Sequence, residues 1–177
     1  MPTATPESPL PHIVDVFKLA VQGASLNGQF EAKHLPRLNE AVQAITGSVQ
    51  AELEFFIGDE GFVEILGSVS GEVSLSCQRC LGEMRQALSG EIKLGVVRKE
   101  EDLAGLPRRL DPWLIDSDSS DLCALLEDEL LLNLPIVALH QSDACEPGPG
   151  LSFGEETGAS ISKENPFQVL EQFKKPR

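Results

Sequence analysis

Hydrophobic and polar residues alternate through the middle of the chain, a period of two that is typical of strands with one buried face. The segment SVQAELEFFIG (48–58) places apolar residues at every second position. After the turn sequence GDEG (58–61), FVEILGSVSGEVSLSC (62–77) continues the pattern, and MRQALSGEIKLGVVR (84–98) forms a third such region. Because strands joined by short turns pair antiparallel, these segments predict an antiparallel sheet.

The flanking segments predict further strands and two helices. IVDVFKLAVQG (13–23) is interpreted as a strand, and residues 113–115 as a short extended piece. LPRLNEAVQAI (35–45) has apolar residues at helical spacing. A second helix, LCALLEDELLLNLP (122–135), is expected to begin after an N-cap at Ser120 or Asp121 and to stop at Pro135.

Together these elements predict an α+β fold, an antiparallel sheet or partly open β-barrel of about five or six strands with two flanking helices. Residues 1–12 are Pro-rich and are expected to form a flexible arm, and residues 13–147 a single α+β domain. Residues 148–177 are rich in Gly, Pro, Ser and Glu. This composition predicts a flexible tail that carries one docking segment near its apolar end.

The charge of the chain is strongly negative and unevenly distributed. The 177 residues carry a formal net charge of −14, and residues 100–129 contain ten acidic residues and only two arginines. Broad contact with nucleic acid or with an anionic membrane is disfavoured, because an acidic surface repels polyanions. A simpler interpretation of the acidic run is a solvated surface.

The sequence predicts a cytoplasmic protein. The N-terminus has neither the charge pattern nor the apolar run of a signal peptide, and no stretch approaches the ~20 apolar residues of a membrane span. In a reducing compartment the four cysteines are expected to be metal ligands or core residues rather than disulfides.

Two pairs of metal-ligand residues stand far apart in the sequence. Cys77 and Cys80 form a CxxC motif at the end of a predicted strand, and His140 and Cys145 follow the second predicted helix. Three thiols and an imidazole are a suitable ligand set for tetrahedral zinc, and four protein ligands imply a structural site. Two alternatives stay open, which are reduced thiols without a metal and a redox-active CxxC.

The remaining candidate residues have simpler interpretations. Cys123 lies in an apolar helical context and is interpreted as core packing, and His12 and His34 as surface residues. Adjacent helical residues point in different directions, so Glu127, Asp128 and Glu129 are not expected to hold one metal ion. Glu127 and Asp128 are expected to point away from the apolar face, whereas Glu129 falls toward it. No nucleophile–base motif is present, so no enzymatic activity and no small-molecule substrate are predicted.

The motifs taken together resemble the YceD family, the large ribosomal RNA subunit accumulation proteins of bacteria. The resemblance extends from about Ile13 to the C-terminus. Its most specific parts are the C-Q-R-C motif, the E-D-E-L-L-L-N-L-P segment (127–135) and N-P-F near the end (165–167). Cys77 and Cys80 match the family's cysteine pair, and His140 and Cys145 match a downstream pair. The further cysteines of some relatives are missing here, so one four-ligand site is expected.

The resemblance implies a non-enzymatic role in the synthesis, processing or stability of large-subunit (23S) ribosomal RNA. An acidic protein can serve this role by binding a basic ribosomal protein or biogenesis factor. Glu127, Asp128 and Glu129 would then belong to an acidic partner surface, and Asn165, Pro166 and Phe167 to a hydrophobic anchor. Direct RNA binding through scattered basic residues and a thiol redox function of the CxxC are the alternatives.

Overall fold

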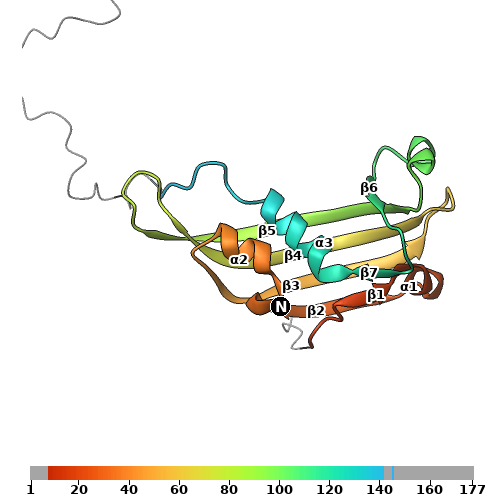
Figure 1. Ribbon diagram of the computed structural model, residues 1–177, viewed down its shortest axis with the longest axis horizontal. Helices are drawn as coiled ribbons and strands as arrows, with labels where there is room; N and C mark the ends of the chain where they lie inside the picture. The colour runs from red at the N-terminus through yellow and green to blue at the C-terminus, as the bar shows by residue number, and fades with distance from the viewer. Residues whose placement is uncertain (1–7, 142–144, 146–177) are drawn as a thin grey trace, which may run out of the picture. The chain divides into compact units, whose positions relative to one another are not determined.

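A computed structural model describes residues 8–141 and residue 145. It is a mixed α+β fold (Figure 1). In chain order its elements are β1 (Ile13–Asp15), α1 (Val16–Gln22), β2 (Ser25–Glu31), the 3-10 helix η1 (Ala32–His34), α2 (Pro36–Ala41), β3 (Ala44–Ile57), β4 (Val63–Ser76), β5 (Glu83–Val97), the 3-10 helix η2 (Glu100–Gly105), β6 (Asp111–Leu114), β7 (Ser119–Asp121) and α3 (Leu122–Leu132).

Five strands form the main sheet in the order β2-β3-β4-β5-β6. The pairs from β2 to β5 are antiparallel, whereas β6 runs parallel to the last four residues of β5. Strands β1 and β7 make a separate antiparallel pair. The predicted antiparallel sheet is confirmed, and in the described residues the sheet stays open rather than closing into a barrel.

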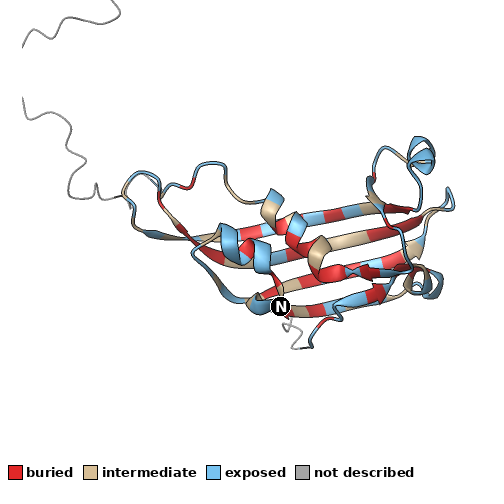
Figure 2. Cartoon of the chain, viewed as in Figure 1, coloured by how far each residue is buried: buried red, intermediate tan, exposed pale blue. Residues whose placement is uncertain are grey.

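The core lies between one face of the sheet and the helices. Helices α2 and α3 lie over this face, and buried residues recur along the strands beneath them (Figure 2). Buried and exposed residues alternate along β3 and β5, because every second side chain points to the same side of a strand. The largest fully buried side chains include Phe30, Leu35, Leu38, Leu53, Phe55, Ile65, Leu122, Leu126 and Leu130.

The segment 13–23, interpreted from the sequence as a strand, is mostly helical. Only Ile13–Asp15 is extended, and α1 follows at once. The Asp15 carboxylate accepts a hydrogen bond from the Lys18 main-chain N–H, and Gly23 closes the helix in the left-handed region at φ 59°. Val16 and Ala20 are buried one helical turn apart. The strand interpretation was wrong because these two caps and the spacing of four favour a helix.

The structure also changes the expected bounds of the helix predicted over 35–45 and of the N-terminal segment. Helix α2 ends at Ala41, and the strand that follows it begins at Ala44. Residues 25–31 form the edge strand β2, which was not predicted from the sequence. In the segment expected to be a flexible arm, Leu10 is buried and donates its N–H to the Gln29 carbonyl at 3.1 Å.

The longest helix that the structure describes is α3, with 11 residues. None of the described helices has the length and apolar character needed to cross a membrane. The tail predicted over 148–177 lies outside the described residues.

Candidate metal centre

Cys77 and Cys80 lie in the turn that joins β4 to β5. The turn is held by two main-chain hydrogen bonds, from Cys77 N–H to the Gly82 carbonyl at 2.9 Å and from Leu81 N–H to the Cys77 carbonyl at 2.8 Å. Leu81 has φ 61°, an uncommon left-handed conformation for a branched side chain, which the tight turn requires. Cys77 is buried and Cys80 is half-buried. The long β4–β5 hairpin therefore presents both thiols from one short turn.

His140 and Cys145 reach the same place from the segment that follows α3. The Gln78 N–H donates to the Ala138 carbonyl at 2.8 Å, which ties this segment to the turn. The Cys77 and Cys145 Sγ atoms are 3.8 Å apart, and the Cys80 Sγ is 3.3 Å from the His140 Nδ1. One donor atom from each of the four residues lies within 4.8 Å of the others. The two predicted ligand pairs are thus brought together.

These separations fit a tetrahedral ion. Two sulfurs bound at ~2.3 Å to a tetrahedral zinc lie about 3.8 Å apart, and a sulfur and a nitrogen about 3.6 Å apart. The observed separations of 3.8 Å and 3.3 Å are close to these values. Three thiols with one imidazole are also a ligand set that selects zinc over the hard cations magnesium and calcium. Distance and donor chemistry therefore both favour one zinc ion.

The imidazole of His140 is oriented by a main-chain group of the sheet. Its Nε2 lies 2.9 Å from the carbonyl oxygen of Glu83, the first residue of β5. An N–H at Nε2 can donate to this carbonyl, which leaves the Nδ1 lone pair directed toward the sulfurs. Metal-bound histidines commonly donate their second N–H in this way.

The main chain around the turn favours the thiolate form of Cys77. Hydrogen bonds from main-chain N–H groups, the strongest from Cys80 and further ones from His140 and Arg79, lower the pKa of Cys77 to about 5. Burial is the main cause that raises the pKa of Cys145, to about 11. One thiolate is thus formed by the protein near neutral pH, whereas Cys145 needs a nearby cation to lose its proton.

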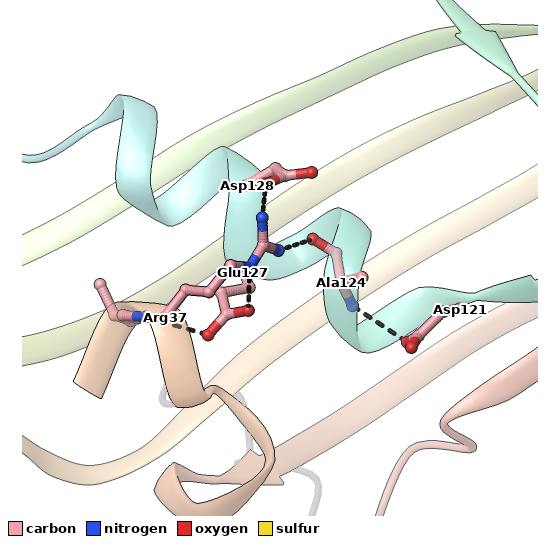
Figure 3. Close-up of polar contacts among 6 residues, drawn as sticks. Arg37, Asp121, Ala124, Glu127 and Asp128 are labelled. Carbon is pink, nitrogen blue, oxygen red and sulfur yellow. Dashed lines mark hydrogen bonds and ion pairs between the residues drawn. The ribbon is translucent and has the colours of Figure 1, made fainter. Parts of the chain in front are cut away.

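The three acidic residues of α3 have three different surroundings. Glu127 is buried, and its carboxylate accepts hydrogen bonds from the Arg37 Nε at 2.8 Å and from the Leu38 main-chain N–H at 2.9 Å (Figure 3). Asp128 is exposed and pairs with the same guanidinium. Glu129 is half-buried over Gly90 of β5. The expectation that Glu127 points away from the core is wrong, because Arg37 on α2 provides a buried partner for it.

Comparison with known proteins places this chain in a family. The family described as "Large ribosomal RNA subunit accumulation protein YceD" matches residues 65–174, a range that includes all four ligand residues. A protein of Haemophilus influenzae (strain Rd) with the same description is 33% identical over 167 residues, which cover 93% of this chain and 96% of that protein. The chain belongs to the YceD family. No solved structure matches it.

Membership of the YceD family confirms the resemblance found in the motifs. The family's description names accumulation of the large ribosomal RNA subunit, so membership implies a role in that process. The motif N-P-F at 165–167, assigned to a hydrophobic anchor, falls within the matched range but outside the described residues.

The setting of the CxxC motif in this YceD-family chain differs from that of a thioredoxin-like redox site. In the redox motif the first cysteine stands at a helix N-terminus, where the helix dipole stabilises its thiolate. Here the motif joins two antiparallel strands. His140 and Cys145 complete a four-donor cluster around it.

The other residues singled out in the sequence lie away from the cluster. Cys123 is buried in the core, as predicted. His12 is exposed, but its ring packs edge-on against the ring of His34, with centroids 4.0 Å apart. His34 is half-buried, so the surface interpretation holds for His12 only. The sequence gives no sign of this pair, because it depends on the fold of the N-terminal segment against β2.

Proposed function

We propose that this YceD-family chain is a non-enzymatic ribosome-biogenesis factor that supports the synthesis, processing or stability of 23S ribosomal RNA by binding a basic protein partner. A protein partner is chosen over RNA because most lysines and arginines of the described residues are already in ion pairs. Six of the ten lysines and arginines in the described residues are in ion pairs with the chain's own carboxylates. Cations that are already paired form a poor surface for phosphates.

Two of the paired arginines each contact two carboxylates. Arg37 contacts Glu127 and Asp128, and Arg109 contacts both Glu60 and the buried Glu64. These contacts hold the guanidinium groups against their own chain. An RNA strand would have to displace buried or bidentate carboxylates to reach either arginine, which disfavours direct RNA binding.

A surface for a basic partner is offered by η2. Its first turn contains Glu100, Glu101 and Asp102, all of which are exposed. Among the described residues none of the three takes part in an ion pair. Such a cluster attracts a positively charged protein and raises its association rate. Within the acidic run of 100–129, the first residues are therefore the best candidates for binding a partner, since Glu127 near the end of the run is already bound to Arg37.

The metal centre has a structural role in this proposal. Zinc bound by Cys77, Cys80, His140 and Cys145 would join the β4–β5 turn to a segment 68 residues downstream. Four protein ligands leave no coordination position for a substrate, which supports a structural ion and no catalytic one. The closed loop contains η2 and α3, so zinc would limit the conformational freedom of the proposed partner surface.

Affinity capture from growing cells tests the partner. The tagged chain should recover a basic ribosomal protein or biogenesis factor, and recovery should fall as salt is raised. The triple variant Glu100→Gln, Glu101→Gln, Asp102→Asn should lose this protein.

A matched control neutralises three other exposed carboxylates, Glu40→Gln, Glu52→Gln and Glu54→Gln, and should keep it. Tight binding of a purified ribosomal RNA fragment with no other protein present would overturn the proposal and favour direct RNA binding.

A further inference from the structure

Strand β5 has a long edge that no described strand covers. The strand comprises 15 residues, and β6 pairs only with Leu94, Gly95, Val96 and Val97. Figure 1 shows β5 at the border of the sheet with β6 beside one end of it. Over residues 85–93 the neighbour is β4 on one side alone, whereas the Glu83 carbonyl lies 2.9 Å from His140 Nε2. An open edge of this length is a template for pairing with another strand.

The free main-chain groups of this edge belong to the odd-numbered residues. Cys77 and Gly82 form a hydrogen-bonded pair, and the β4–β5 register continues from there without a shift. Residues alternate in an antiparallel pair, so the N–H and C=O of Arg85, Ser89, Glu91 and Lys93 point away from β4. The side chains of these same residues are exposed on the face of the sheet away from α3.

The charges along this edge are complementary to themselves. If β5 pairs antiparallel with a second β5 so that Leu88 faces the partner subunit's Leu88, Arg85 lies opposite the partner subunit's Glu91. In the same register Glu83 lies opposite the partner subunit's Lys93. Two-fold symmetry repeats both contacts, which gives four opposite-charge pairs across the junction.

Other registers lose this match. A shift of two residues in one direction places Glu83 opposite the partner subunit's Glu91, and a shift in the other direction places Arg85 opposite the partner subunit's Lys93. Like charges directly opposite each other are destabilising. The favourable register is also centred on the open stretch, because Leu88 is the midpoint between Arg85 and Glu91, His140 lies at Glu83, and β6 begins to pair at Leu94.

The other face of the strand supports the same register. Met84 is half-buried and Ile92 is buried. The register places Met84 opposite the partner subunit's Ile92, and Ile92 opposite the partner subunit's Met84. We propose that two copies of this chain pair through Arg85–Glu91 of β5, which joins their sheets into one continuous antiparallel sheet around a two-fold axis at Leu88. Up to about eight main-chain hydrogen bonds form along this junction.

Sedimentation equilibrium of the full chain over the micromolar range tests the proposal through a charge exchange. Arg85→Glu or Glu91→Arg alone creates two like-charge contacts and should weaken the dimer at least about tenfold. The double variant R85E/E91R restores opposite charges in the same register and should dimerise as the unmodified chain does. The exchange breaks two ion pairs within the chain, Arg85 with Glu72 and Lys93 with Glu91, but all four side chains are exposed, so the cost to the fold is small.

Glu54→Arg is the matched control, since this residue is exposed on β3, inside the sheet, and should leave the dimer unchanged. A chain that stays monomeric at all concentrations overturns the proposal, whether the edge is solvated or covered by the chain's own tail. A dimer that neither single variant weakens, or that the double variant does not restore, overturns it as well.

Discussion

The contact between Arg37 and Glu127 makes a quantitative prediction about stability. The Glu127 side chain is 3% exposed, and Arg37 Nε is the only charged donor to its carboxylate in the described residues. Replacing Arg37 with Met leaves this carboxylate with the Leu38 N–H as its remaining donor. An uncompensated buried charge costs roughly 3–5 kcal/mol. The Arg37 side chain is 48% exposed, so water partly replaces it and the expected loss is about 2–3 kcal/mol.

Urea unfolding measures the coupling free energy between Arg37 and Glu127. It compares four proteins, which are the unmodified chain, Arg37→Met, Glu127→Met and the double variant. The double variant removes the buried charge as well as its partner, so it should be more stable than Arg37→Met alone. The coupling free energy should be about 2 kcal/mol. Asp128→Asn is the control for the exposed half of the contact and should cost under about 1 kcal/mol. If the effects of the two single variants simply add, Arg37 does not stabilise the buried Glu127 carboxylate.

Three further predictions concern the fold and its pH dependence. Gly67→Ala should destabilise the sheet by about 2 kcal/mol or more, since a Cβ there would lie 2.0 Å from the Glu52 carbonyl oxygen. Gly105→Ala is the control, because its Cβ meets nothing closer than 3.4 Å, and it should be nearly neutral in urea unfolding. Burial is the main cause that lowers the pKa of His34, so the fold favours the neutral imidazole. The stability that depends on this neutral side chain is full above the pKa of the unfolded chain, near 6.5, and is lost as pH falls toward the pKa in the folded chain. The urea midpoint should therefore drop less between pH 7 and pH 5.5 in His34→Gln than in the unmodified chain, and equal drops would contradict this. Cys123→Ala should lose about 1 kcal/mol of stability and should keep its bound metal. Loss of metal in this variant would show that Cys123 belongs to the metal centre.

The three central strands and the two ligand pairs could be predicted because their signals are local. Alternation along β3, β4 and β5 is set by burial of one face, and a CxxC motif shows two thiols that a single turn can direct to one ion. The pairing of Cys77 with Cys145 across 68 residues was predicted from ligand chemistry rather than from any pattern between them.

The errors arose where the deciding contact is distant or where two local signals compete. Glu127 is buried because Arg37, 90 residues earlier, provides a charge for it, and no spacing in the sequence announces that partner. Segment 13–23 fits both a strand and a helix by its apolar residues, and the Asp15 cap decides between them. Strand β2 has weak alternation and takes its position from its pairing with β3.

The metal centre is proposed to hold one structural zinc ion, bound by Cys77, Cys80, His140 and Cys145. Elemental analysis of chain purified without a histidine tag tests it directly, with free thiols counted in the same sample. We expect one zinc per chain, and we expect Cys80→Ser to lose the ion and to lower the unfolding midpoint. Reduced protein that contains no stoichiometric zinc would contradict a zinc centre at these four residues.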